Sequence, residues 1–211
     1  MKFHDVSVLI CEDMPVWPGD PGISMTLASS LDKGNDANVT RLAMGVHTGT
    51  HIDAPFHFEA NGKSIEQLQI DTLIGSCQVF ELPEIKGGIG PNDIEKFDIE
   101  GETRILFKTK NSIWWKTDER KFQKDFVYIT EEGAKLLISL GVKLVGIDYL
   151  SVESFESSDY ATHHLFLRNQ VVIIEGLNLS HVSSGEYELI ALPLRIKGAD
   201  GSPARVILRE F

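Results

Sequence analysis

Apolar residues gather in short runs along the chain, separated by segments rich in glycine, proline and charged residues. Short apolar runs bounded by turn-forming residues are typical of strands. The pattern predicts strands over residues 3–11, 37–46, 76–82, 104–109, 142–149, 171–175, 189–196 and 205–208. Residues 110–125, which combine two adjacent tryptophans with many charges, are predicted to form a loop or flap.

Helical periodicity is clearest over residues 131–140, which follow Thr130 as an N-cap and stop at Gly141. A short helix is also predicted from Pro91 or Asn92 to Phe97. Many strands with few helices predict a single mixed α/β domain that spans residues 1–211.

The candidate chemistry is concentrated in the sequence His-Thr-Gly-Thr-His-Ile-Asp-Ala-Pro-Phe-His-Phe, which begins at His47. An extended strand turns alternate side chains to the same face, so His47, His51 and Asp53 would share a face. His57 has the same parity, although Pro55 ends regular strand pairing just before it.

Two imidazoles and one carboxylate on one face form a ligand set for a borderline divalent ion such as Zn²⁺, and Mn²⁺ also suits mixed nitrogen and oxygen ligands. Three ligands leave room for water or for a second ion, as in catalytic sites. A helix would also bring His47 and His51 together, but Gly49 and Pro55 disfavour it. The remaining alternative is a polar strand with surface histidines.

Further candidates lie far from this stretch in the sequence. The adjacent pair His163 and His164 precedes an apolar segment, and Glu175 ends the apolar run that begins at Val171. A carboxylate there is costly to bury unless it is paired or bound to metal, and the alternative is a solvated strand end. Trp17 lies in a loop rich in proline and glycine, where it is either part of the core or a recognition ring.

The composition narrows the classes of function. The 211 residues carry a net charge of −11, which argues against a nucleic-acid partner because no basic patch could neutralise phosphates. The chain has no long apolar run that would span a membrane and no apolar signal region behind its N-terminus. Cys11 and Cys77 are too few for a disulfide scaffold, so we expect buried, reduced thiols in a cytoplasmic protein.

The pattern His-x-Gly-Thr-His-x-Asp-x-Pro-x-His-Phe resembles the signature of the metal-dependent cyclase/hydrolase family, which includes bacterial kynurenine formamidase and isatin hydrolase. The segment from Glu175 to Leu179, twelve residues beyond His163, fits the downstream part of that signature. The resemblance implies two metal positions that share Asp53, with His164 as the neighbouring alternative to His163. The implied ligands are His47, His51, Asp53, His163 and Glu175.

The resemblance also implies an α/β domain of the swivelling β/β/α type that assembles as a homo-oligomer, a dimer or a tetramer. It implies that an aryl formamide, N-formyl-L-kynurenine, is hydrolysed to L-kynurenine and formate in tryptophan breakdown. Trp17 would contact the aromatic substrate, and Phe56 is a further candidate for contact with its ring.

The residues themselves predict a metal-assisted hydrolase, because a bound zinc lowers the pKa of its water from 15.7 to about 7. His57 lies near the ligands and is suited to take the water proton and return it to the leaving amine, and Glu175 would combine ligation with proton handling. The alternatives are a related hydrolase of a cyclic amide such as isatin or of another small amide or ester, and a non-catalytic module stabilised by metal.

Overall fold

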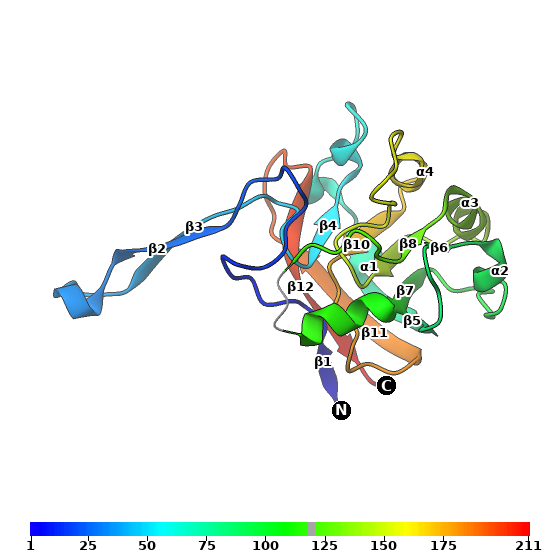
Figure 1. Ribbon diagram of the computed structural model, residues 1–211, viewed down its shortest axis with the longest axis horizontal. Coiled ribbons are helices and arrows are strands. Elements are labelled where there is room, and N and C mark those ends of the chain that lie inside the picture. Colours follow the sequence, from blue (N-terminus) through cyan, green and yellow to red (C-terminus); the bar gives the residue numbers. More distant parts are fainter. Residues whose placement is uncertain (118–120) are drawn as a thin grey trace.

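The computed structural model describes residues 1–117 and 121–211, and most of its strands form one mixed sheet (Figure 1). The strand order is β1-β12-β11-β5-β7-β9-β10-β4, and β4 also pairs with β12. Seven strands therefore close into a barrel-like sheet, with β1 attached at its side. The strands are β1 (Phe3–Asp5), β4 (His51–Asp53), β5 (Ile74–Leu82), β7 (Arg104–Thr109), β9 (Leu144–Ile147), β10 (Val172–Glu175), β11 (Gly185–Pro193) and β12 (Gly201–Arg209).

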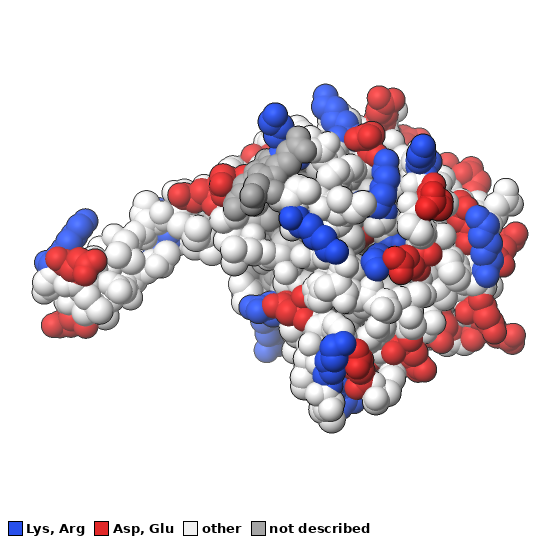
Figure 2. Space-filling view, turned by 60° about the horizontal axis from the view of Figure 1, so that its bottom comes forward, with Lys and Arg blue, Asp and Glu red and all other residues white. Residues whose placement is uncertain are grey.

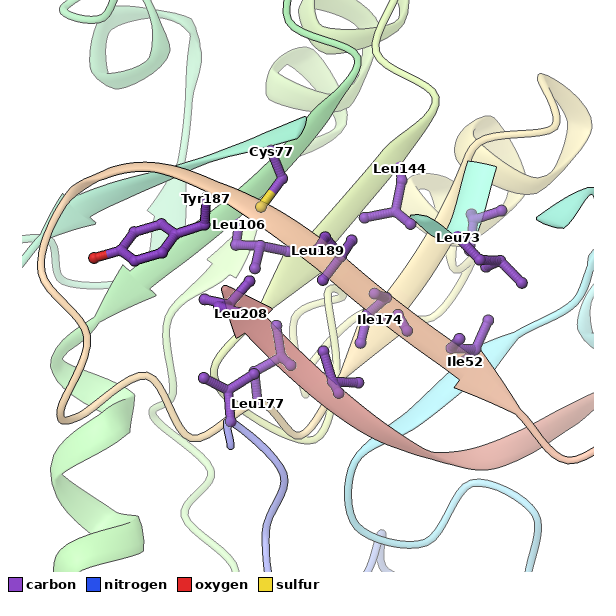
Figure 3. Close-up of a cluster of buried hydrophobic side chains, with 14 of the residues drawn as sticks. Ile52, Leu73, Cys77, Leu106, Leu144, Ile174, Leu177, Tyr187, Leu189 and Leu208 are labelled. Carbon is purple, nitrogen blue, oxygen red and sulfur yellow. The ribbon is translucent and has the colours of Figure 1, made fainter. Parts of the chain in front are cut away.

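Alternation along the strands gives the barrel two apolar faces. Leu106 and Ile174 point into the barrel, where they pack in the interior cluster of Figure 3. Their neighbours Ile105 and Ile173 point outward into a second cluster. Helices α2 (Pro91–Ile94), α3 (Glu131–Ser139) and α4 (Ala161–Arg168) supply buried residues to that outer cluster. A strand that is buried on both faces needs apolar residues at every position, as the apolar runs of the sequence indicate.

The single mixed α/β domain predicted from the sequence is confirmed. The helix predicted over residues 131–140 is α3, and the Thr130 hydroxyl caps it by accepting a hydrogen bond from the Gly133 amide. Several predicted strands are shorter than expected, most clearly residues 3–11, of which only Phe3–Asp5 are strand. The region 110–125, predicted as a loop or flap, begins instead with a 3₁₀ helix, Lys110–Lys116, and residues 118–120 of this prediction lie outside the described part of the chain.

Smaller elements escaped the sequence patterns. They are β2 (Ser24–Ser29), β6 (Gly88–Ile89), β8 (Tyr128–Ile129), α1 (Ile70–Leu73) and α4. The strand predicted over residues 37–46 is β3 (Val39–Ala43), which pairs only with β2 in a hairpin that projects from the barrel (Figure 1). We call residues 24–43 the arm. Its strands are exposed because no other element in the described part of the chain covers them.

The surface agrees with the acidic composition. On the face in Figure 2, the lysine and arginine side chains are scattered among aspartate and glutamate. None of the helices in the described residues combines the length and apolar character needed to cross a membrane. Cys77 is buried as expected, and burial raises the pKa of its thiol to about 12, whereas Cys11 is only half-buried.

Candidate metal centre

The closing strand of the barrel organises the candidate site. In β4, Ile52 points into the barrel, so His51 and Asp53 point outward on the opposite face. Strand β10 runs antiparallel beside β4 and places Glu175 directly opposite His51. Residues directly opposite in an antiparallel pair share a face, so the sheet register itself brings Glu175 to the histidine.

His47 reaches the same point by a different route from the one predicted. The regular strand begins only at His51, and residues 47–50 form a turn in which Gly49 has φ +67°. Gly176, with φ +68°, packs against this turn so closely that a Cβ atom would lie 2.2 Å from the Gly49 carbonyl oxygen. Two glycines, and not strand alternation, therefore bring the His47 turn against the end of β10.

The five predicted ligands converge. His47 Nδ1 lies 2.8 Å from Asp53 Oδ1, and His51 Nε2 lies 3.4 Å from the same oxygen. His51 Nε2 is also 3.3 Å from Glu175 Oε2. His163, on α4, has its Nε2 3.3 Å from Glu175 Oε1 and 3.8 Å from Asp53 Oδ2.

Helix α4 separates the two adjacent histidines. His164 turns away from the cluster, and its Nδ1 lies 2.7 Å from the Glu59 carboxylate, which Arg168 also contacts. The geometry therefore places His163, and not His164, beside Asp53 and Glu175. The sequence did not predict this helix, so it left the choice between the two open.

The buried polar atoms of the cluster fit a bound cation. His51 Nε2 and Asp53 Oδ2, both within the cluster, are buried without a hydrogen-bond partner in the described residues. Such atoms are rare in folded proteins and require an explanation, for which an ion is one candidate. Two sets of ligand atoms lie close enough to hold an ion, and they share Asp53: His47, Asp53 and His57, and His51, Asp53 and Glu175.

This arrangement agrees with a shared Asp53 but adds His57 to the candidate ligands. The His57 ring stacks on His47 with centroids 3.8 Å apart, and its Nδ1 lies 3.4 Å from Asp200 Oδ2. His57 is therefore placed either to complete a metal position or to carry a proton beside it. Imidazole and carboxylate donors of this kind suit Zn²⁺ or Mn²⁺.

Charge pairing sets the protonation of the metal-free cluster. Burial opposes the charged form of His51, yet the adjacent carboxylates of Asp53 and Glu175 raise its pKa to about 10. The pKa of His163 is likewise raised to about 10, against burial, by Glu153 and Glu175. Burial also opposes ionisation of Asp53, but the charge and hydrogen bond of His47 hold its pKa well below the usual value. For His57 burial dominates and lowers the pKa.

These shifts predict how the stability of the metal-free protein changes with pH. A histidine whose pKa rises from 6.5 to about 10 on folding contributes stability that is complete below pH 6.5 and is lost as pH rises through about 10. We therefore expect the thermal midpoint of the metal-free protein to fall over that range. NMR titration of the imidazoles would attribute the loss to His51 and His163. If all the histidines titrated below pH 8, the prediction would be wrong.

The sequence missed two carboxylates that support the cluster. Asp200 Oδ2 lies 2.9 Å from His47 Nε2, although the two residues are 153 positions apart. Glu153 accepts hydrogen bonds from the backbone amides of Thr162 and His163, and so fixes the start of α4. Neither residue lies in a motif, and only the closure of the sheet and the packing of α4 bring them here.

A cavity of about 340 Å³ opens above the cluster. Trp17 lines the cavity and also packs against Phe122 and Phe155. Its ring is therefore part of an aromatic cluster and is also exposed to a ligand in the cavity. The remaining lining residues are Asp20, His47, His57, Phe58, Leu150, Ser151, Glu153, Tyr160, His163 and Glu175.

The expectation that Phe56 lines the cavity is wrong. The 3₁₀ turn Pro55–His57 directs the ring to solvent, where it is 42% exposed. Phe58 takes its place and stacks on His163 with ring centroids 4.5 Å apart. Trp114 and Trp115 instead pack on Tyr149 and line a separate cavity of about 380 Å³.

Comparison with known proteins identifies the family. The model of the family described as "Putative cyclase" matches residues 4–154. The chain belongs to this family. It is 36% identical over 210 residues to the kynurenine formamidase of Bacillus anthracis, covering 100% of this chain and 98% of that protein. It is 41% identical over 207 residues to the kynurenine formamidase of Geobacillus thermodenitrificans, covering 98% and 97%.

Solved structures of similar proteins support the same family and fold. One described as a potential metal-dependent hydrolase with cyclase activity has a TM-score of 0.86 and 37% identity, and the match covers 100% of this chain and 99% of that one. Isatin hydrolase A from Labrenzia aggregata has a TM-score of 0.84 at 23% identity, covering 98% and 93%, and shows that the fold is shared.

Proposed function

We propose that this family member is a metal-dependent amide hydrolase that converts N-formyl-L-kynurenine into L-kynurenine and formate. The observation that carries the proposal is the convergence of His51, Asp53, His163 and Glu175, with unpartnered buried atoms, beneath a cavity lined by aromatic rings. Relatives that are 36% and 41% identical over nearly their whole length bear the name kynurenine formamidase. Both lines of support point to amide hydrolysis on an aromatic substrate.

The donor set would suit two divalent ions that share Asp53 as a ligand. By the family resemblance His47 and His51 would hold one ion and His163 and Glu175 the other, whereas the ligand atoms that lie close together group His47 with His57 and His51 with Glu175. Zn²⁺ is the ion we propose, and Mn²⁺ is the alternative. Bound there, the ions would polarise the amide carbonyl and make a water molecule more acidic.

The protein supplies the proton transfers. Burial lowers the pKa of His57, so its ring is neutral near pH 7 and can accept the proton of the attacking water. Asp200 lies beside Nδ1 of His57 and orients the ring. The same ring would return the proton to the amine nitrogen as the C–N bond breaks and formate is released, and Glu175 would combine ligation with proton handling.

Aromatic side chains would hold the substrate ring. Phe58 lies between His163 and Tyr160, with its ring centroid 5.3 Å from that of Tyr160. Trp17 lines the same cavity and is fixed by its own aromatic neighbours. Rigid aromatic walls bury the substrate ring with little loss of side-chain freedom.

The test is turnover of N-formyl-L-kynurenine by purified protein, first stripped of metal and then supplied with Zn²⁺ or Mn²⁺. The proposal expects hydrolysis that depends on the added ion. If the protein binds metal and hydrolyses isatin or another small amide or ester instead, the proposed substrate is wrong and the assignment as a metal-dependent hydrolase stands. Metal binding without turnover of any amide or ester would indicate a non-catalytic module.

We also propose a homo-oligomer, most simply a dimer, that forms through the arm. The pairing of Met25 with Leu42 places these residues and Leu27 on one face of the arm, while Thr26 and Arg41 lie on the other. The three apolar side chains are between 38% and 48% exposed. An isolated two-stranded hairpin is marginally stable in water, so a partner that covers this face would stabilise it.

A second copy of the chain fits the charge of the arm. The arm carries Asp32, Lys33, Asp36 and Arg41, which sum to zero, whereas the whole chain carries −11. Figure 2 shows charged side chains at the tip and a largely uncharged stem. Such a stem can approach another acidic copy without charge repulsion, and symmetric homo-oligomers are the commonest assemblies.

We expect Leu27→Glu to convert the dimer into a monomer, because it places a charge within the proposed contact. Light scattering after gel filtration would measure the mass. Thr26→Glu is the matched control on the polar face of the arm and should leave the dimer intact. A wild-type monomer, or a Leu27→Glu dimer, would contradict the proposal.

Cys77 is a buried free thiol, which suits the reducing cytoplasm that we propose as the location of the enzyme.

A further inference from the structure

The cavity above the cluster is lined by several carboxylates but by no lysine or arginine in the described part of the chain. Three of the lining residues carry carboxylates, Asp20, Glu153 and Glu175. A group that enters this cavity with a positive charge therefore meets carboxylate partners, and a carboxylate meets no lysine or arginine among the described lining residues.

Two of these carboxylates already have partners. Glu175 lies against His51 and His163 within the candidate metal cluster and also accepts a hydrogen bond from the backbone amide of Val152. Glu153 is buried and accepts hydrogen bonds from two backbone amides at the start of α4. Neither is available to a substrate group without loss of these contacts.

Asp20 is the exception. Its side chain is exposed at the cavity wall, and in the described residues no hydrogen bond or ion pair reaches its carboxylate. The charge is therefore free to pair with a ligand. An exposed carboxylate is ordinary by itself, but this one faces the same cavity as the candidate metal cluster.

The backbone fixes Asp20 relative to Trp17. The amide of Asp20 donates a hydrogen bond of 3.0 Å to the Trp17 carbonyl oxygen, which closes a four-residue turn over Pro18 and Gly19. Gly19 has φ +102°, as the third position of a type II turn requires, and proline suits the second position. The aromatic wall and the free carboxylate are thus carried by a single turn that Phe122 and Phe155 hold in place.

We propose that Asp20 determines specificity by pairing with an ammonium group on the side chain of the aryl formamide. The inference rests on the proposed function and narrows its substrate class. N-formyl-L-kynurenine carries an ammonium and a carboxylate on one side chain, and the cavity selects the ammonium and leaves the carboxylate to solvent. Neutral cyclic amides such as isatin lack this group and gain nothing from Asp20.

Three aryl formamides separate the two charges. N-formyl-L-kynurenine has both charges, N-formylkynuramine has only the ammonium, and 2-formamidoacetophenone has neither. For Asp20→Asn we expect kcat/KM to fall about fivefold to tenfold for the first two substrates, mainly through KM. The third substrate should change far less. The losses should also shrink at high ionic strength, because salt screens an exposed ion pair.

Equilibrium binding gives a readout that does not require turnover. Calorimetry with the products should show that the wild-type protein binds kynuramine more tightly than 2-aminoacetophenone, and that Asp20→Asn removes the difference. Glu156→Gln is the control, because Glu156 is an exposed carboxylate nearby that does not line the cavity. It should leave both comparisons unchanged.

The possible failures are distinct. Equal losses of kcat/KM on all three substrates would overturn the role of Asp20, and the proposed formamidase function would stand. Slow turnover of N-formylkynuramine by the wild-type protein, relative to N-formyl-L-kynurenine, would show that the carboxylate is recognised and would also overturn it. Failure of the wild-type protein to hydrolyse any of the three would instead reject the proposed function.

Discussion

Asp53→Asn is expected to reduce kcat/KM at least about a thousandfold, equivalent to about 4 kcal/mol of transition-state stabilisation, and to lower the metal content of the protein. Asp53 is completely buried, and three imidazoles share its carboxylate. It also belongs to both sets of ligand atoms that are close enough to hold an ion. Asparagine keeps the size of the side chain but removes the charge and turns an NH₂ group toward one of the rings.

The measurement pairs steady-state kinetics with metal analysis of the purified variant. Asp71→Asn removes a carboxylate from an exposed position and serves as the control for expression and folding. Glu175→Gln should retain more metal than Asp53→Asn, because Glu175 belongs to only one of the two sets. If Asp53→Asn kept full metal content and activity, Asp53 would not be the shared ligand.

Part of the convergence of the ligands could be predicted because it follows from local rules, whereas the ligand roles of His163 and Glu175 came from the family resemblance. Alternation puts His51 and Asp53 on one face of β4, and the costly position of Glu175 at the end of an apolar strand pointed to a partner. The sequence does not contain the register that pairs Glu175 with His51. That register depends on which strands become neighbours when the sheet closes.

Closure of the sheet also explains why nothing in the sequence pointed to Asp200 as part of the site. Strand β4 lies between β10 and β12, and its pairing with β12 sets Gly201 opposite Asp53. A Cβ atom at Gly201 would lie 2.6 Å from the His47 ring, so only glycine lets β12 pass this close, and Asp200 is carried in beside it. A contact across 153 residues has no local signal in the sequence.

The arm and Phe56 show two further features that the sequence pattern could not predict. The apolar residues of β3 indicated a strand correctly, but they gave no sign that this strand lies outside the barrel. An apolar face that is exposed on a hairpin has the same periodicity as one that is buried in the core. For Phe56, no pattern in the sequence showed that the 3₁₀ turn Pro55–His57 directs the ring to solvent.

Replacing His57 with Ala is expected to lower kcat by about 10²- to 10⁴-fold while metal binding is preserved, because general base catalysis contributes this much. The ring lies on His47, beside Asp200, and burial lowers its pKa, so it is in the form that accepts a proton near pH 7. The acidic limb of the pH–rate profile of the wild-type enzyme should therefore lie below the pKa of an ordinary histidine. His181→Ala, which removes an exposed histidine, is the control.

Metal analysis of His57→Ala separates the two roles that the geometry allows. If His57 carries protons, the variant retains its ions and added imidazole restores part of the activity. If His57 completes the set with His47 and Asp53, one ion is lost and kcat falls with the metal content. Full activity with full metal content would reject both roles, and would leave the stacked ring as packing for His47. Because these outcomes differ in metal content as well as in rate, one variant decides how the chain divides its histidines between holding the ions and moving the proton.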